Sequence, residues 1–139
     1  MRMLFAFALL MMAGLTVQAQ SSPLGLWKTI DDETGEAKSH VEIYEKGGKL
    51  YGKVAKLLLK PADTLCDKCK GDKNNKPVLG MVIVDGLAKE GTVWKGGSIL
   101  DPANGNVYGC SLWLEGQELK VRGKHWTGLY RTQTWYRVK

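Results

Sequence analysis

Apolar and polar side chains alternate with a period of two along much of the chain, which is the pattern of β-strands that bury one face. In residues 119–124, Leu119, Val121 and Gly123 alternate with three basic side chains. In residues 107–114, Tyr108 falls on the same face as Leu112. About eight strands of this kind are predicted, at residues 25–30, 40–44, 50–58, 77–85, 92–100, 107–114, 119–124 and 129–138.

The turn at residues 101–105 shows how such strands are joined. Pro102 presets the backbone for a turn, Asp101 can bond the backbone beyond it, and Gly105 tolerates a positive φ. No convincing helix is found, although residues 63–73 could form a single helical turn. Short strands at regular spacing, joined by successive hairpins, predict an all-β fold. We expect a single antiparallel up-and-down barrel, which leaves no edge strand exposed.

The first residues are predicted to be a signal peptide. Arg2 is followed by an apolar run over residues 4–15 and by Val17-Gln18-Ala19, which matches the small-x-small cleavage pattern. The run has 12 residues, whereas a bilayer-spanning helix needs about 20. We therefore expect residues 1–19 to be removed and residues 20–139 to form one β-barrel domain. The protein should then be periplasmic or secreted and not membrane-spanning.

The chain is basic, with 20 Lys and Arg against 14 Asp and Glu and a formal net charge of +6. The basic residues are spread along the whole chain, and many alternate with apolar residues. A solvated outer face is therefore favoured over a nucleic-acid footprint, and we expect no nucleic-acid partner.

Three groups of motifs occur in a distinctive order. Gly25-Leu26-Trp27 stands near the start, Trp94-Lys95-Gly96-Gly97 and residues 100–108 stand in the middle, and residues 131–137 stand at the end. In this combination, residues 24–139 resemble a secreted bacterial family catalogued as domain-of-unknown-function family 2147. Asp72-Lys73-Asn74-Asn75 is similar to an Asp-x-x-Asn that members of that family carry in a middle loop. The cysteine pattern departs from theirs, so it is given no family role.

A glycine two residues before Trp27, together with an arginine near the end of the chain, also resembles the calycin superfamily, which includes lipocalins. In that superfamily, the tryptophan of the first strand packs under an arginine of the last strand and closes one end of the barrel. The resemblance implies a lipocalin-like barrel closed by Gly25, Trp27 and Arg131, with Arg137 as the other candidate arginine. The implied role is structural.

The motif Cys66-Asp67-Lys68-Cys69 has three interpretations. Because the protein is expected to be exported, a disulfide between Cys66 and Cys69 is the favoured interpretation. A redox motif would normally open a helix after a strand, which this sequence does not provide. A metal site would need two more ligands, and the only other cysteine or histidine side chains in the sequence are Cys110, His40 and His125. Cys110 shares the face of apolar residues and is expected to be buried, and a bridge from Cys110 to the loop stays open.

The sequence gives no support for catalysis. It contains no Gly-x-Ser-x-Gly, and no cysteine lies close to a histidine in sequence. His125 is more typical of a packed or capping residue than of a base. The oxygen-bearing side chains of residues 63–74 could bind Ca²⁺, but interspersed lysines favour a solvated loop. We expect no catalytic residues, no metal and no cofactor, and a non-enzymatic role is favoured over an enzyme.

The favoured function is therefore non-catalytic binding of a small amphipathic ligand or an envelope component. Small residues on the strands could leave room for it or could only relieve bending: Gly52, Ala55, Gly80, Gly109 and Gly123. The residues predicted to bind it are Tyr108, Arg122, Arg131 and Gln133. The alternatives are a thiol- or metal-handling protein that uses Cys66 and Cys69, and a protein-interaction module with exposed aromatic side chains.

Overall fold

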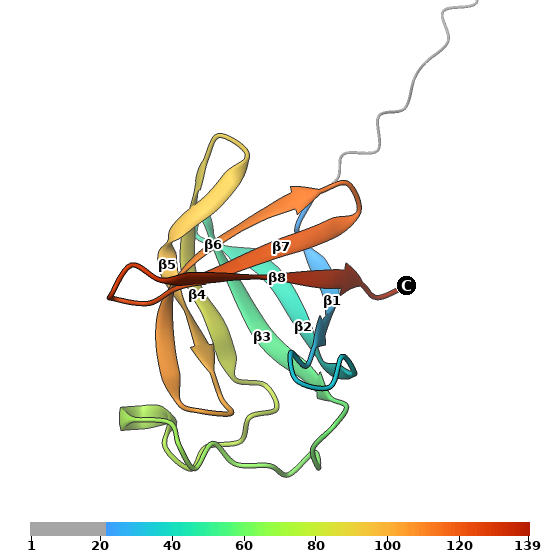
Figure 1. Ribbon diagram of the computed structural model, residues 1–139, viewed down its shortest axis with the longest axis vertical. Coiled ribbons are helices and arrows are strands. Elements are labelled where there is room, and N and C mark those ends of the chain that lie inside the picture. The colour runs from blue at the N-terminus through green and yellow to red at the C-terminus, as the bar shows by residue number, and fades with distance from the viewer. Residues whose placement is uncertain (1–21) are drawn as a thin grey trace, which may run out of the picture.

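The computed structural model describes residues 22–139, which form a closed barrel of eight antiparallel strands paired in chain order (Figure 1). The expected all-β architecture, a single antiparallel up-and-down barrel of about eight strands, is confirmed. The predicted signal peptide lies outside the described residues. The strands are β1 (Gly25–Ile30), β2 (Ala37–Lys46), β3 (Lys49–Leu57), β4 (Val82–Glu90), β5 (Val93–Asp101), β6 (Asn106–Glu115), β7 (Glu118–Lys124) and β8 (Tyr130–Arg137).

The fourth strand differs from the prediction at its start. Residues 77–81 belong to the preceding loop, because Gly80 adopts a φ of 84° and interrupts the strand. The apolar pattern there is real, however, since Val78 and Met81 are buried in the core. The loop also hydrogen-bonds to β3, through Gly80 N to the Val54 carbonyl at 2.7 Å and Val54 N to the Met81 carbonyl at 2.9 Å. A strand-like run of residues can therefore pair with a sheet without continuing as a strand.

The fourth strand also extends further than predicted. The sequence predicts a turn over residues 86–91, whereas β4 continues to Glu90 and the turn is confined to Gly91 and Thr92. Gly86 has a φ of 70°, and Gly96 on the paired strand β5 has a φ of 85°. Both strands of this hairpin thus carry a glycine that bends the backbone without ending the pairing.

One end of the barrel is filled by side chains. Trp27, Leu50, Leu87, Leu112 and Leu119 have no exposed surface there. Gly52 also points inward, but a Cβ at this position would lie 2.9 Å from the Ile43 side chain and 3.1 Å from Val84. The small residue in this strand therefore makes room for its neighbours rather than for a ligand. We refer to this end of the barrel as the closed end.

The seam between the first and last strands is short. β1 and β8 pair through only two positions, Trp27 with Arg137 and Lys28 with Tyr136. β7 and β8, by comparison, pair through seven positions from Glu118 to Lys124. Beyond Lys28, therefore, backbone pairing does not join β1 to β8.

Helical structure is limited to a single turn in residues 22–139. The 3₁₀ segment η1 (Gly71–Lys73) falls at the end of the stretch that could form one helical turn. Within the described part of the chain, no helix has the length and apolar character required to cross a membrane.

Candidate functional site

The barrel is hollow at the end opposite Trp27. A cavity of about 530 Å³ opens there, where β1, β3, β5 and β7 end and β2, β4, β6 and β8 begin. Its floor is apolar and is formed by Val54, Ile83, Ile99, Val121 and Trp135. Its rim carries four acidic and four basic side chains, which are Asp31, Asp32, Asp67, Asp101, Lys38, Lys60, Lys68 and Arg131. The cavity is therefore amphipathic, with charge at the mouth and hydrocarbon at the base.

Two turns of the same design stand at this mouth. In the β1–β2 turn, Gly35 N donates to the Asp31 carbonyl at 2.8 Å, and Glu33 N donates to the Asp31 side chain at 3.0 Å. The β5–β6 turn repeats this, with Gly105 N to the Asp101 carbonyl at 2.8 Å and Ala103 N to the Asp101 side chain at 2.9 Å. The two glycines have φ values of 73° and 74°. The aspartate at the first position and the glycine at the fifth explain both turns.

Backbone donors also set the charge of the first of these aspartates. Hydrogen bonds from the backbone of Thr34 and Glu33 hold the pKa of the exposed Asp31 carboxyl below its ordinary value of 3.8. Asp31 is therefore ionised at neutral pH, and the rim keeps its negative side chain.

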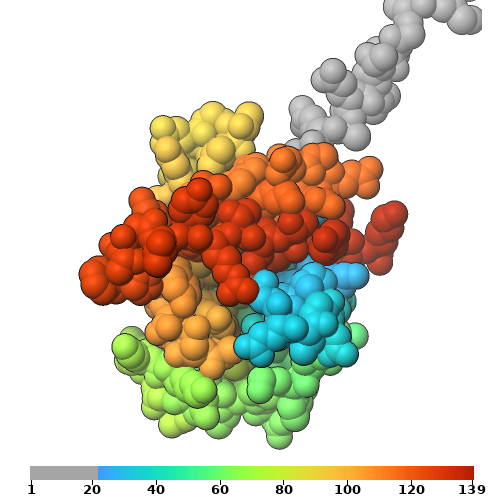
Figure 2. Space-filling model, in the orientation of Figure 1, coloured from blue at the N-terminus to red at the C-terminus, as the bar shows by residue number. Residues whose placement is uncertain are grey.

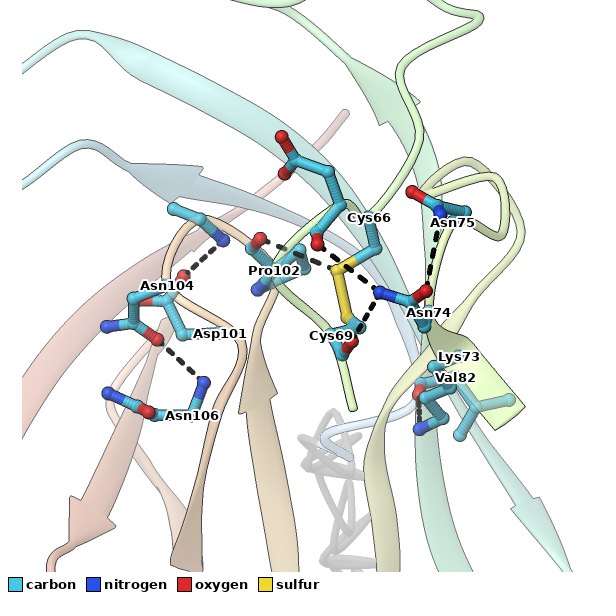
Figure 3. Close-up of a disulfide and its surroundings, with 12 residues drawn as sticks. Cys66, Cys69, Lys73, Asn74, Asn75, Val82, Asp101, Pro102, Asn104 and Asn106 are labelled. Atoms are coloured by element: carbon cyan, nitrogen blue, oxygen red, sulfur yellow. Dashed lines mark hydrogen bonds between the residues drawn. A yellow bond between two sulfur atoms is a disulfide. The ribbon is translucent and has the colours of Figure 1, made fainter. Parts of the chain in front are cut away.

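The loop over residues 58–81 lies across the same end of the barrel (Figure 1). Cys66 and Cys69 form a disulfide within it, and the buried Cys66 Sγ lies 3.5 Å from the carbonyl oxygen of Pro102 (Figure 3). This is a packing contact, because a disulfide sulfur has no hydrogen to donate. Gly105 completes the docking, since a Cβ at this position would overlap the backbone carbonyl of Lys68.

Further hydrogen bonds fix the loop internally and to β4. The Asn74 side-chain amide donates to the Cys69 carbonyl at 2.9 Å, and the Lys73 ammonium donates to the Val82 carbonyl at 2.8 Å (Figure 3). Asn74 and Lys73 belong to the Asp-x-x-Asn segment noted in the sequence. Its observed role is to brace the disulfide loop.

Three of the four predicted ligand residues, Tyr108, Arg131 and Gln133, line the cavity. Arg122 does not, because period-two alternation in β7 turns Val121 and Gly123 inward and Arg122 outward. Its guanidinium lies 5.0 Å from the Trp113 ring centroid and 4.3 Å from that of Tyr130. Arg122 therefore does not line this cavity, and its contacts lie on the outer surface of the barrel.

Asp32 is a residue of the site that the sequence reasoning missed. Its Oδ2 lies 2.8 Å from the Arg131 guanidinium and accepts a hydrogen bond of 2.7 Å from the Gln133 amide. Gln133 in turn accepts a hydrogen bond of 3.2 Å from Trp135 Nε1. A polar chain thus runs from the floor to the rim and joins the β1–β2 turn to β8 where the backbone seam is open. No motif marks Asp32, because its partners lie about a hundred positions away.

A second polar pair on the cavity wall was also missed. Thr29 and Ser39 are buried, and their hydroxyl oxygens lie 2.7 Å apart. Both residues line the cavity. Period two from the predicted inward Trp27 places Thr29 on the inner face, so the sequence contained the signal for this residue.

At the closed end, Arg137 and not Arg131 meets Trp27. The Arg137 guanidinium carbon lies 4.3 Å from the Trp27 ring centroid. Arg137 also donates to the carbonyls of Leu24 and Ser22 at 2.9 and 2.6 Å. A Cβ on Gly25 would lie 2.9 Å from the guanidinium, so the glycine gives it room. Arg131 lies at the opposite end of β8, six positions away, which is why it cannot reach Trp27.

The remaining chemistry-bearing residues are separate from one another. Cys110 is the one free cysteine of residues 22–139 and is buried, and burial raises the pKa of its thiol from 9.0 to about 12. His125 hydrogen-bonds to Thr127 in the exposed β7–β8 turn. No group of three or more His, Cys, Asp or Glu side chains that could hold a metal ion occurs in the described part of the chain.

Thiol counting tests this arrangement of the cysteines. Native protein at neutral pH should not react with iodoacetamide, because the Cys110 thiol is buried and protonated. Denatured protein should take up one label without reductant and three after reduction, as measured by mass. The reduced protein should remain folded, since so short a loop constrains the unfolded chain little. Uptake of three labels before reduction would contradict the disulfide, and loss of the fold on reduction would point to a long-range bridge.

The same thiol gives a pH dependence. Because the pKa is raised in the folded state, the unfolded chain loses this proton first as the pH rises. As the pH rises through 9.0 toward 12, Cys110 should therefore progressively lower the free energy of unfolding, measured by urea denaturation.

Comparison with known proteins agrees with this architecture. A solved structure of the protein HP1028 from Helicobacter pylori, described as belonging to the lipocalin family, superposes with a TM-score of 0.75 at 20% identity, covering 85% of this chain and 84% of that one. No curated protein matches the chain. Residues 25–137, from the first residue of β1 to the last of β8, match the model of a family described as "uncharacterized protein conserved in bacteria (DUF2147)". The chain is therefore a member of the bacterial family DUF2147, built on a lipocalin-like barrel.

Proposed function

We propose that this protein is an exported, non-catalytic binding protein that holds a small amphipathic molecule in the open half of its barrel. The observation that carries the proposal is the cavity of about 530 Å³, with an apolar floor and a charged rim. Small-molecule sites typically have volumes of about 300–1,000 Å³ and combine apolar walls with a few placed polar groups. Export is supported by the signal-peptide pattern of residues 1–19 and by the disulfide, which persists in oxidising compartments.

The arrangement of the cavity suggests how the ligand lies. Its hydrocarbon part would contact Val121, Ile83 and Trp135 at the base, where no charged side chain is found. Its polar head would remain at the rim, close to the Asp32–Arg131 pair. Because acidic and basic side chains are equally frequent on the rim, a polar or zwitterionic head is favoured over a doubly charged anion.

Gly123 offers a direct test, because it lines the cavity and faces inward. A Cβ at Gly123 would lie 3.4 Å from Tyr108 and would meet no backbone, so a larger side chain can enter the cavity without distorting β7. We expect Gly123→Leu to abolish the change in tryptophan emission that fatty acids or envelope phospholipids cause in the wild-type protein. Trp135 is the tryptophan that lines the cavity and should report binding.

Gly109 provides the matched control. It lies on the adjacent strand, opposite Lys124, while its neighbour Cys110 is opposite Gly123. Gly109 is exposed, and a Cβ there would approach nothing closer than 3.7 Å. Gly109→Leu should therefore bind lipid as the wild type does. Equal binding by both variants, or no emission change with any fatty acid or phospholipid tested, would contradict ligand binding in this cavity.

A further inference from the structure

The turn between β7 and β8 presents apolar side chains to solvent. We call residues 125–130 the β7–β8 tip. Within it, Trp126 is 89% exposed, Leu129 is 76% exposed and Tyr130 is 62% exposed. Val107, at the start of the neighbouring strand, is 63% exposed and borders the same surface hollow as Trp126. Monomeric proteins rarely leave such groups together without a partner.

Hydrogen bonds hold the tip in this form. His125 N donates to the Leu129 carbonyl at 2.7 Å, and Gly128 N donates to the His125 carbonyl at 2.9 Å. The His125 ring lies 2.8 Å from the Thr127 hydroxyl and packs against Trp126 at 5.2 Å between centroids. The apolar side chains are therefore carried on a defined turn, which protrudes from the body of the protein (Figure 2).

The basic side chains beside this tip belong mostly to the last two strands, which carry the net charge of the chain, although Lys120 and Arg137 of these strands lie toward the closed end. Of the protein's 20 basic and 14 acidic residues, six basic and no acidic residues lie in positions 119–139. The remaining 118 positions thus carry 14 residues of each sign and no net charge. Lys124 precedes the tip on the outer face of β7, Arg122 stacks on Tyr130, and Lys70 borders the hollow beside Trp126.

We propose that the β7–β8 tip is a membrane-interface anchor that inserts Trp126 and Leu129 into the surface of an anionic phospholipid bilayer. An indole, a phenol and an aliphatic side chain surrounded by cations are the combination that peripheral proteins use at the lipid headgroup level. Leu129 argues for lipid over a sugar chain, since sugars are bound by aromatic stacking and hydrogen bonds. The protruding shape also suits insertion into a fluid surface.

This location connects the anchor to the cavity. The tip begins two residues after Gly123 and ends directly before Arg131, and both Gly123 and Arg131 line the cavity. A bilayer that receives the tip therefore lies at the open end of the barrel, where an amphipathic ligand could pass between membrane and cavity. The anchor does not depend on the proposed ligand, because the residues that form it lie outside the barrel.

Vesicle co-sedimentation tests the anchor, with vesicles of phosphatidylglycerol and phosphatidylcholine compared with phosphatidylcholine alone. We expect binding to the anionic vesicles only, with weakening by added salt and a blue shift of Trp126 emission. Trp126→Ser combined with Leu129→Ser should weaken binding about tenfold or more, since burial of one large apolar side chain is worth such a factor. Leu24→Ser combined with Tyr136→Ser, two exposed apolar side chains near the closed end, should leave it unchanged.

A second pair of variants tests the charges. Lys70→Gln with Lys124→Gln should weaken binding about 30-fold, from about fivefold for each cation near an anionic surface. Lys46→Gln with Lys49→Gln, in the β2–β3 turn of the closed end, is the control with the same change in net charge. All of these side chains are exposed, so circular dichroism should show wild-type folding for every variant.

The outcomes separate the anchor from the ligand site. Gly123→Leu should bind vesicles normally, and the tip variant should still bind monomeric fatty acid. Equal binding to neutral and anionic vesicles, wild-type binding by the tip variant, or no vesicle binding at all would overturn the anchor.

Discussion

Replacement of Trp27 by alanine should lower the free energy of unfolding by about 3–5 kcal/mol, measured by urea denaturation. The indole has no exposed surface, and its Nε1 donates to the Pro23 carbonyl at 2.8 Å. Its removal would leave a large void at the closed end and would also remove the base on which Arg137 rests.

The contact with Arg137 should appear as coupling between the two residues. In a double-mutant cycle, Trp27→Ala and Arg137→Ala should interact by about 0.5–2 kcal/mol. Arg131→Ala is the control, because Arg131 lies on the same strand but at the open end, paired with Asp32. Additive effects of Trp27→Ala and Arg137→Ala would show that the stacked geometry contributes no energy, whereas coupling of Trp27 to Arg131 would contradict the closure described here.

Gly105→Ala should be the second strongly destabilising change, and it should also displace the disulfide loop. At a φ of 74°, any residue with a Cβ is strained by about 1–2 kcal/mol. The added methyl group would also overlap the Lys68 carbonyl, which cannot move without lifting residues 66–69 from the turn. Overpacking of this kind costs about 1–3 kcal/mol more.

Gly35→Ala separates these two contributions. Gly35 has a φ of 73° in a turn with the same hydrogen bonds, but nothing lies within 4 Å of a Cβ at that position. Gly35→Ala should therefore show the backbone strain alone. Urea denaturation gives the energies, and limited proteolysis within residues 58–81 reports the loop. If the two variants were equally stable and equally resistant to protease, the loop would not be docked on Gly105.

Much of the fold follows from local patterns in the sequence. The period of two identified the inward faces of β6 and β7, and the Asp-Pro-x-x-Gly turn marked the hairpin between β5 and β6 correctly. The largest errors concern the bounds of β4 and lie at glycines. Gly86 and Gly80 both have a positive φ, yet one bends a continuing strand and the other ends a strand-like run. The difference depends on whether the paired strand bends at the same place, as β5 does at Gly96. The sequence around a glycine does not show which residue of another strand it will pair with.

The cavity was less predictable, because how far side chains fill the barrel interior depends on packing between strands that are distant in sequence. Gly52 and Gly123 both face the interior, and the sequence treats them alike. The side chains of Ile43 and Val84 occupy the space beside Gly52, whereas the space beside Gly123 remains open as cavity. Likewise, the alternation of Arg122 with Val121 and Gly123 already predicted that its side chain points outward, and the structure places it there, away from the cavity.

The short seam has a consequence for the order in which the barrel assembles. Seven of the eight pairings join strands that follow each other in the chain, and all of these except β3–β4, which are separated by the loop over residues 58–81, can form as local hairpins. The eighth pairing, between β1 and β8, joins residues as far apart in sequence as Trp27 and Arg137, which are separated by 110 positions. It adds only two paired positions to the sheet. The entropy of closing so long a loop must be lost before these contacts form, which places closure of the ring late in folding.

Interactions that form late in folding mainly slow unfolding and have little effect on the folding rate. The side-chain links across the seam, from Arg137 to the segment before β1 and from Asp32 to β8, therefore set how long the closed ring persists rather than how fast it forms. Slow opening of this kind is itself a form of protection against proteolysis.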